Sequence, residues 1–479
     1  MSDHAPNTDG HHHDGFRLRW WMWILLVLVI VFSAIFGMRQ HGWTRYQAVQ
    51  ADLKAKGYAT TAVELVAKAP PVDKDRQERL WRAMEVMKNH PWAEWQGGTI
   101  FERLREKAEN DPDRLKISRN LLDGAIDMEN LESVLDEGPV ELSVFGWIER
   151  DPGRLAKKTL WELATSRIPL LLVSRGCAHW WGSQAIAATN PTTALKRLDC
   201  WNKSLEKPGT LIDAMIGLAV GEIRDQVYLW LAVRGRLPAQ QQIDWMTEDP
   251  QQVRWVADGL AGERCLWWEP MSHSNVAEAF EFTRFAVVSD MTDHLYPAKF
   301  HEIARGIQAI GDMEAELKGT PRPTPVPPAP FGFNYISRIA FPSLGECSIT
   351  AHQSAFRHRQ SRIAGVIASH YRTNPNLPAS RNDLAAWLPT GYLEAKTPDN
   401  PAIQYERLSP GRFRIGIDPL AKPPSIPASR WGPTYTSTIG QQPDREPVKD
   451  CRWSLEIDLD AILIPPPPPK PRALKPANP

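Results

Sequence analysis

The apolar pattern of the chain begins with a stretch of nineteen positions that no charged residue interrupts, residues 20–38, WWMWILLVLVIVFSAIFGM. At about 1.5 Å of rise per residue, a helix of this length measures roughly 28 Å, close to the thickness of the hydrocarbon core of a bilayer. The pattern predicts one transmembrane helix over residues 20–38. Indole rings at its first end, from Trp20, Trp21 and Trp23, suit the headgroup level.

A cleaved signal peptide would have a shorter apolar run and a cleavage site of small residues. Here the run extends to Met38 and contains a single small pair, Ser33-Ala34, so an uncleaved anchor is favoured. We expect the N-terminus in the cytoplasm, because a short tail, one span and a large C-terminal body form the usual signal-anchor arrangement. More Arg and Lys residues follow the span than precede it. Because positive residues favour the cytoplasmic side, this count argues for the opposite orientation.

The first 19 residues carry four histidines among Asp, Asn and Gly. This composition is typical of a disordered, solvated tail. A metal-binding tail is the less favoured alternative, and the histidines concerned are His4, His11, His12 and His13.

After the span, apolar residues recur at three- and four-residue steps, the period of an amphipathic helix. Residues 211–233 are apolar enough to suggest a second span, but each charged group near a bilayer centre costs about 2.5 to 3.5 kcal/mol. The charged residues Asp213, Glu222, Arg224 and Asp225 therefore indicate a buried helix of a water-soluble domain. We expect an irregular, all-helical domain over residues 43–320, with helices over 43–56, from about 73, and over 114–135, 155–173, 211–233, 238–255, 275–288 and 298–318.

The helical pattern stops at residues 321–330, which contain six prolines in ten positions and predict an extended linker. A helix over residues 355–371 and a short helix capped by Ser380 follow. Residues 402–408 and 412–417 flank a Ser-Pro-Gly turn and alternate in polarity, which predicts a β-hairpin. Residues 451–464 predict one more strand. Together these elements form a small α+β module over residues 331–464, which a proline-rich tail over residues 465–479 follows.

Residues 370–419, HYRTNPNLPASRNDLAAWLPTGYLEAKTPDNPAIQYERLSPGRFRIGIDP, carry a family resemblance. The features follow one another in this order: a helix ending in Tyr-Arg, a Leu-Pro-Ala-Ser run, a Tyr-Leu pair and a hairpin. This order resembles the C-terminal part of uncharacterised bacterial single-pass membrane-anchored proteins, and it looks like the end of type II secretion major pseudopilins. The likeness to the uncharacterised group covers about residues 40–460 and implies no activity.

The sequence departs from the pseudopilin pattern at two places. Asp399-Asn400-Pro401 stands where Asp-Pro-Trp or Asp-Pro-Phe is usual, and the anchor lacks the Gly-Phe-Thr-Leu-x-Glu motif of prepilin processing. The resemblance therefore does not extend to processing or to assembly into a pilus.

Composition narrows the function classes. The 479 residues contain 56 basic and 56 acidic side chains. Because nucleic-acid-binding proteins generally present a basic face, nucleic acid is not an expected partner. The length suggests two to four domains, and the 20 tryptophans, spread through the body, are expected to fill helix contacts.

The five cysteines form no Cys-x-x-Cys pair and have no histidine at zinc spacing, which excludes a zinc ribbon. A body outside the cytoplasm permits disulfides. The pairs that lie within one predicted domain are Cys177 with Cys200 and Cys347 with Cys451, and free thiols are the equal alternative. No metal or cofactor is expected.

Catalytic signatures such as G-x-S-x-G, H-E-x-x-H, the P-loop and G-x-G-x-x-G do not occur in the sequence. Cys177 and His179 could form a nucleophile pair, but we favour a tryptophan-packed loop over residues 175–181, RGCAHWW. Three alternating acidic residues of the last strand could bind calcium, but a solvated strand face is favoured. They are Glu456, Asp458 and Asp460.

His352, His358 and His370 lie on or near one helix at spacings of six and twelve residues. Chelation from a helix needs an i, i+4 pair, so a metal or catalytic role is not favoured for them.

We therefore expect a mainly α, single-pass protein of the bacterial inner (cytoplasmic) membrane, anchored in the lipid bilayer through residues 20–38, with its soluble domains in the periplasm. Binding or scaffolding of envelope proteins is the favoured role, and an enzyme is less favoured. One alternative is an envelope hydrolase for a carbohydrate or peptide, which a deep pocket with two close carboxylates would indicate. Another is an accessory component of a secretion or pilus-like system.

Overall fold

The computed structural model describes residues 14–69, 71–85, 127–143, 145, 168–248, 251–272, 298–320, 335–394, 402–417, 436–439 and 452–460. These residues are mostly helical, with a long apolar helix near the N-terminus and a small sheet near the C-terminus, which confirms the expected fold class at this level. Residues 1–13 of the predicted N-terminal tail, the C-terminal tail, the proline-rich linker and the helix over residues 275–288 lie outside the described residues. The expectation of disorder is wrong for residues 14–19, which form the start of a helix that continues into the apolar stretch.

Contacts group the chain into two compact units, each assembled from segments far apart in the sequence. Unit 1 comprises Met1–Lys68, Arg150–Ser166 and Ala261–Pro342. Unit 2 comprises Ala69–Glu149, Arg167–Leu260 and Ser343–Pro479. Each unit is described by itself below.

Unit 1 is organised around α1 (Asp14–Ala55), whose portion Trp20–Ala55 is long and apolar enough to cross a membrane. Apolar side chains between Trp20 and Phe36 are exposed on every side of the helix. From Gly42 onwards one face is buried, at steps of four, three and four residues, through Tyr46, Val49 and Leu53. The expected separate helix over residues 43–56 is wrong: α1 continues through this region because nothing breaks it before Gly57, whose φ of 84° ends it.

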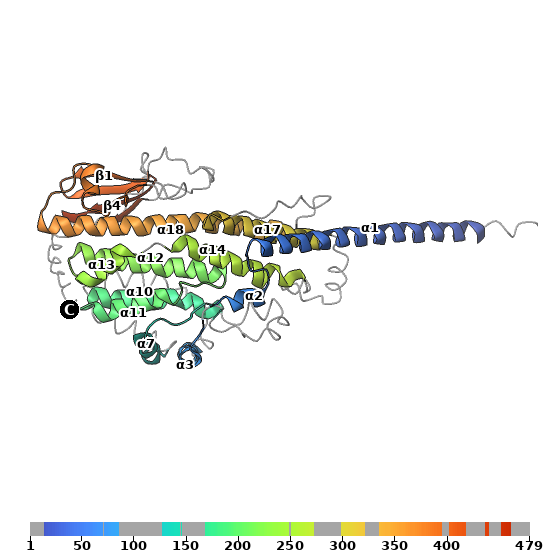
Figure 1. Cartoon of the computed structure of the whole chain (residues 1–479), viewed down its shortest axis with the longest axis horizontal. Coiled ribbons are helices and arrows are strands. Elements are labelled where there is room, and N and C mark those ends of the chain that lie inside the picture. Colours follow the sequence, from blue (N-terminus) through green and yellow to red (C-terminus); the bar gives the residue numbers. More distant parts are fainter. Residues whose placement is uncertain are drawn as a thin grey trace, which may run out of the picture. The chain divides into compact units, whose positions relative to one another are not determined.

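α1 packs on α17 (Lys299–Lys318) in unit 1 (Figure 1). Gly42 allows the close approach, since a Cβ there would lie 3.0 Å from the His301 ring. The rings of Trp43 and Phe300 pack edge to face at 4.9 Å between centroids. The C-terminal half of the apolar helix is thus part of the core of unit 1.

The remainder of unit 1 is held by buried polar contacts. It contains α2 (Ala62–Ala67), the π-helical turn η3 (Glu263–Trp268) and the 3-10 turn η4 (Pro270–Ser272). Arg264 in η3 pairs with Glu314 of α17 and donates to the carbonyl of Ala59, 3.0 Å from Nη2 to O. The expected cap of α2 forms at Thr61, whose Oγ1 accepts from the Glu64 N–H at 3.2 Å.

Unit 2 is built around α12 (Leu211–Val233), a buried helix with the predicted bounds (Figure 1). Thr210 caps it in a full capping box with Asp213. α10 (Ile168–Ala187) approaches closely at Gly182, where a Cβ would lie 2.7 Å from Val227 Cγ2. The further helices of the bundle are α3 (Lys74–Glu85), α7 (Met128–Asp136), α11 (Thr192–Lys203), α13 (Ala239–Thr247) and α14 (Gln252–Gly262).

Two local expectations in this unit are wrong. Residues 175–181 are not a loop but part of α10, because burial of Cys177, Trp180 and Trp181 overrides their weak helix propensity. The single helix expected over residues 238–255 is two helices, α13 and α14, and the sequence places Pro250 between them. A proline disfavours helix in the residue before it, which accounts for the break.

The C-terminal part of unit 2 contains a helix and a small sheet. α18 (Tyr335–Thr373) starts 20 residues before its predicted beginning at 355 and leads to α19 (Arg381–Ala385), which Ser380 and Asp383 cap as expected. β1 (Ile403–Ser409), β2 (Arg412–Ile417) and β4 (Arg452–Asp458) are antiparallel neighbours, which confirms the hairpin and the additional strand.

A fourth strand, β3 (Thr436–Ile439), pairs parallel to β4 and completes the order β1-β2-β4-β3. It lies in a segment expected to be a long loop, because four residues with one large apolar side chain give no alternating pattern. The sheet packs beside α18, whose Gln360 donates from Nε2 to the Ile415 carbonyl at 2.8 Å (Figure 1).

Candidate functional site

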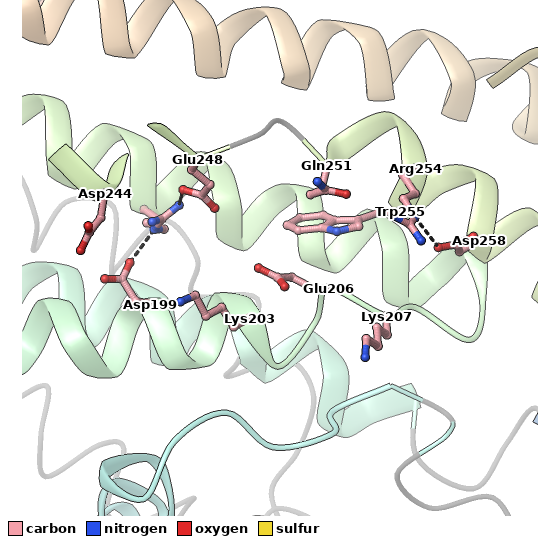
Figure 2. A pocket seen from close by; sticks show the side chains of 11 residues that line it. Asp199, Lys203, Glu206, Lys207, Asp244, Glu248, Gln251, Arg254, Trp255 and Asp258 are labelled. Carbon is pink, nitrogen blue, oxygen red and sulfur yellow. Dashed lines mark hydrogen bonds and ion pairs between the residues drawn. The ribbon is translucent and has the colours of Figure 1, made fainter. Parts of the chain in front are cut away.

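A groove of about 440 Å³ opens in unit 2 between α11, α12 and the segment that joins α13 to α14 (Figure 2). Its volume is in the range of ligand sites, which usually measure about 300 to 1,000 Å³. Most such sites are lined by apolar side chains, whereas this one is lined by charges. The lining residues are Asp199, Lys203, Glu206, Lys207, Arg224, Asp244, Glu248, Gln251, Arg254, Trp255 and Asp258.

Helical spacing brings these side chains to the groove. Asp199 and Lys203 are four residues apart on α11, and Arg254 and Asp258 are four apart on α14, with 3.9 Å between Nε and Oδ2. Residues at this spacing share one helix face. Arg224, from the buried helix α12, forms the floor of the groove.

The floor is a buried ion-pair cluster. Arg224 donates from Nε to Asp199 Oδ1 and from Nη1 to Glu248 Oε2, both at 2.6 Å. Tyr228 donates its hydroxyl to Asp199 Oδ2 at 2.6 Å. Burial alone would lower the pKa of Arg224, but the charges of Asp199 and Glu248 outweigh it and raise that pKa well above its ordinary value. The guanidinium is therefore permanently charged and holds both carboxylates in place.

Charges in the groove are sorted by depth. The side chains of Asp199 and Glu248 are 22% and 26% exposed, and Glu206 is also half-buried. Lys203, Lys207 and Arg254 are exposed, and the Arg254 side chain is 74% exposed. Burial first and the charge of Glu248 second raise the pKa of Glu206. In the interior Arg224 is thus surrounded by carboxylates, while the other cationic side chains of the lining are at the rim together with the exposed Asp244.

A small cavity of about 10 Å³ lies at the inner end of the groove and shares Arg224, Glu248, Gln251 and Trp255 with it. Asn202 also lines this cavity and is 3% exposed. Its Oδ1 accepts no hydrogen bond within the described part of the chain. A Cβ on the neighbouring Gly221 would lie 3.4 Å from this oxygen.

A second polar cluster lies behind the floor. Asp225 of α12 accepts from Trp245 Nε1 at 2.9 Å and pairs with His358 Nδ1 of α18. Burial alone would raise the pKa of Asp225, but the charge and hydrogen bond of His358 and the charge of Arg224 lower it overall. Among the predicted histidines, His358 is therefore fixed by a carboxylate, and His370 stacks on Trp387 at 4.4 Å between ring centroids.

Among the described residues, no three His, Cys, Asp or Glu side chains are placed to hold a metal.

The proposed nucleophile pair is not assembled in unit 2. Cys177 and His179 are both buried in α10, and residues two apart on a helix do not face each other. Burial raises the pKa of the Cys177 thiol, whereas a nucleophilic cysteine needs a lowered one.

The first pair of disulfide candidates is not joined in the structure. Cys177 and Cys200 are thiols, on α10 and on α11. Cys451 lies outside the described residues, so its pairing with Cys347 stays a prediction.

The candidate calcium ligands of the last strand have donors from the protein itself. Glu456 is buried and accepts from Arg412 at 2.8 Å and from Arg414 at 2.6 Å. Asp460 lies past the end of β4 and accepts from the Tyr371 hydroxyl at 2.7 Å. These contacts fit a paired strand surface rather than an ion cage.

Sequence reasoning missed the groove, since its residues come from four helices and match no motif. One signal was present: Arg224 and Asp225 interrupt a very apolar helix. Buried charges require partners, so these two residues indicated a polar cluster, although the sequence could not say which residues complete it.

Comparison of the chain with protein-family models, with curated proteins and with solved structures found no match. Function is therefore argued from the geometry of the groove.

Proposed function

We propose that this protein is a single-pass protein of the bacterial inner membrane whose helical body binds a protein partner through the charged groove. The observation that carries the proposal is the ion-pair floor, in which Arg224 holds Asp199 and Glu248 at 2.6 Å each. Binding sites gain affinity when their polar groups are already fixed in place, because less order must be imposed on association. Fixed charges also select partners by complementarity.

The anchor supports the membrane part of the proposal. Between Trp20 and Phe36 the apolar side chains of α1 are exposed on all sides, as a lipid-facing helix requires. Beyond Gly42 the same helix is part of the core of unit 1. An unbroken helix would hold unit 1 next to the bilayer, and we propose that both units lie on its periplasmic side.

A hydrolase is the second candidate, and Glu206 is the observation that favours it. A half-buried carboxyl whose pKa is raised by burial and by a second carboxylate, Glu248, is the arrangement of a general acid. Trp255 borders the same groove, but at 4% exposure it presents little ring surface to a sugar. Binding is preferred because Glu248 is held by Arg224 and lies 3.4 Å from Arg362 Nη2, so both contacts engage this carboxylate with cations of the protein itself.

Site-specific photo-crosslinking in intact cells tests the binding role. We expect a crosslinking residue at Lys203 or Arg254, on opposite walls of the groove, to give the same discrete adduct in the membrane fraction. The control position is Arg82, on α3, whose side chain is 73% exposed and does not line the groove. Absence of an adduct at both rim positions, or the same adduct at Arg82, would refute binding through the groove.

The hydrolase alternative is tested with the purified full-length protein in detergent and isolated cell-wall material. Release of soluble fragments that Glu206→Gln abolishes, while Asp52→Asn in unit 1 leaves it intact, would establish the hydrolase. Without such release the binding role stands alone.

A further inference from the structure

We infer that the groove takes up a cationic group, the guanidinium or ammonium of an arginine or lysine side chain on the partner protein. This inference rests on the proposed binding function and specifies its chemistry. It follows from the charge sorting, from a buried acceptor and from an aromatic ring in the same groove.

The charge sorting decides the sign of the ligand. The one basic side chain of the floor, Arg224, is already engaged by Asp199 and Glu248. An anion that entered would meet these carboxylates and Glu206 at short range, in surroundings where burial strengthens the repulsion. A cation would be attracted by Glu206, a half-buried groove carboxyl whose pKa is raised by burial and by the charge of Glu248, although Lys203, Arg224 and Lys207 act to lower it.

The inner end of the groove adds an acceptor that points to a donor on the ligand. Asn202 is 3% exposed, and its Oδ1 accepts no hydrogen bond from the described residues although it borders a cavity that shares four residues with the groove. A buried acceptor without a donor costs about 1 to 3 kcal/mol. An N–H donor that reaches the inner cavity would recover part of this cost.

The indole of Trp255 supplies a third element. Figure 2 shows this ring extending from α14 into the groove, with Gln251 on one side and Glu206 on the other. The face of a tryptophan attracts cations by about 0.5 to 2 kcal/mol, depending on burial. A carboxylate, an amide oxygen and an indole together form a set that recognises a guanidinium or ammonium group.

The exposed cations at the rim are compatible with this ligand. Lys203, Lys207 and Arg254 extend into solvent, where their charges are screened within about 8 to 10 Å at physiological salt. They would oppose the approach of a cation weakly. Removal of one of them should therefore strengthen binding.

Calorimetric titration of the purified full-length protein in detergent with a blocked peptide, acetyl-Gly-Arg-Gly-amide, tests the inference. We expect saturable binding that weakens with added salt. The matched probe is the citrulline peptide, which has nearly the same shape but no charge, and we expect it to bind at least about tenfold more weakly. Equal binding of the two peptides would overturn the inference.

Substitutions in the groove test whether the arginine peptide binds there. We expect Glu206→Gln and Asn202→Leu each to weaken binding of the arginine peptide about tenfold, and Lys207→Gln to strengthen it about twofold. Asp52→Asn, a carboxylate change on α1, should leave it unchanged. Thermal unfolding of every variant shows whether it is folded, and Glu206→Gln, at a half-exposed position, carries the test if Asn202→Leu does not fold.

Two further kinds of outcome are informative. One distinguishes a partner side chain from a free polyamine as the source of the cation, and the other distinguishes failure of this inference from failure of the proposed function. Binding of spermidine without binding of the arginine or lysine peptides would overturn the assignment to a partner side chain. Loss of peptide binding with an intact photo-crosslinked adduct at the groove rim would refute this inference alone. Loss of the adduct with peptide binding retained would refute the proposed partner function instead.

Discussion

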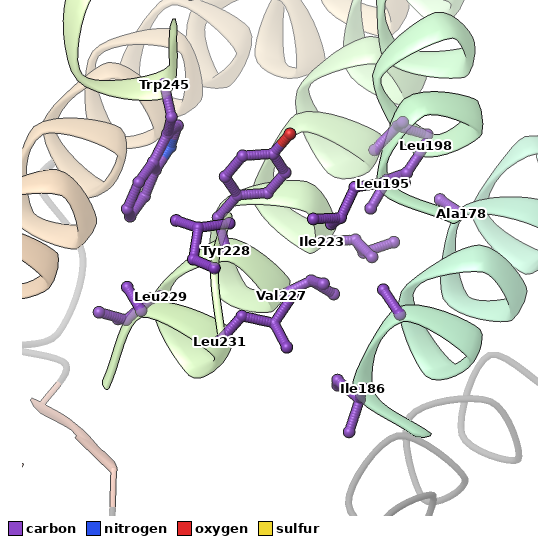
Figure 3. Close-up of a cluster of buried hydrophobic side chains, with 14 of the residues drawn as sticks. Ala178, Ile186, Leu195, Leu198, Ile223, Val227, Tyr228, Leu229, Leu231 and Trp245 are labelled. Carbon is purple, nitrogen blue, oxygen red and sulfur yellow. The ribbon is translucent and has the colours of Figure 1, made fainter. Parts of the chain in front are cut away.

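The two sides of α12 are ordered by different physical means. One side carries Ile223 and Val227, and Leu231, seven residues after Arg224, lies at its border; all three belong to the apolar core (Figure 3). The other side carries Arg224 and Asp225, which are also buried but are held by ion pairs and hydrogen bonds. A shift of a single residue along the helix separates a packed core from a charged floor.

This difference shows which side of a buried helix depends more strongly on the identity of each side chain. Apolar packing is non-directional and tolerates exchange among side chains of similar volume. A buried ion pair requires every partner, because a charge left without one costs several kcal/mol. The polar side of α12 should therefore be the more sensitive to substitution, although its pairs contribute little net stability compared with an apolar replacement of the whole cluster.

The largest effect is expected for Arg224→Met, which removes the charge that Asp199 and Glu248 share. We expect a loss of about 3 to 5 kcal/mol in the free energy of unfolding, because two half-buried carboxylates remain close together without their cation. Urea unfolding of the full-length protein, followed by tryptophan fluorescence, measures it. Arg82→Met, at an exposed ion pair, should change stability by less than about 0.5 kcal/mol. A loss of stability as small as this for Arg224→Met would show that the buried ion pairs are no more sensitive to substitution than an exposed pair.

The apolar side is tested by Leu231→Ala, which leaves a cavity at a fully buried position. The expected loss is about 3 kcal/mol, from the transfer of the side chain and the unfilled space. Leu231→Met should lose less than about 1.5 kcal/mol, because volume is conserved. Similar losses for the two variants in the same urea unfolding measurement would show that this side, too, depends on specific contacts.

The Asp225 pair predicts a pH dependence of stability. The pKa of Asp225 in the folded state is lower than its ordinary value, because His358 and Arg224 outweigh burial. Its stabilising contribution is therefore complete above about pH 4, the ordinary pKa of an aspartate, and is lost as the pH falls through the lowered folded value. Asp225→Asn should lose about 2 kcal/mol at pH 7, and the gap between variant and wild type should narrow below pH 4. A gap that stays constant down to pH 2 would contradict this origin.

The sequence predicted the apolar side of the molecule better than the polar side. The bounds of α12, the hairpin of β1 and β2, the strand β4 and the cap at Ser380 all followed from local periodicity and turn residues. Local pattern could not show that α1 continues past the apolar stretch, since this depends on packing of Gly42 against α17. The joining of Asp199, Arg224 and Glu248 needs three elements that are adjacent only in the fold, so no spacing in the sequence indicates it.

The smallest effect is expected at the beginning of α12, where both sides of the helix are positioned. Thr210 Oγ1 accepts from the Asp213 N–H at 3.1 Å, and the Asp213 carboxylate accepts from the Thr210 N–H at 2.9 Å. Thr210→Ala should cost about 1 kcal/mol, because one N–H of the first turn loses its acceptor. Thr210→Ser keeps the hydroxyl and should cost less than half as much. Because a cap fixes the start of a helix without choosing between its faces, peptide binding at the groove should be the same in both variants, and a change in that binding would show that the cap positions the charged floor.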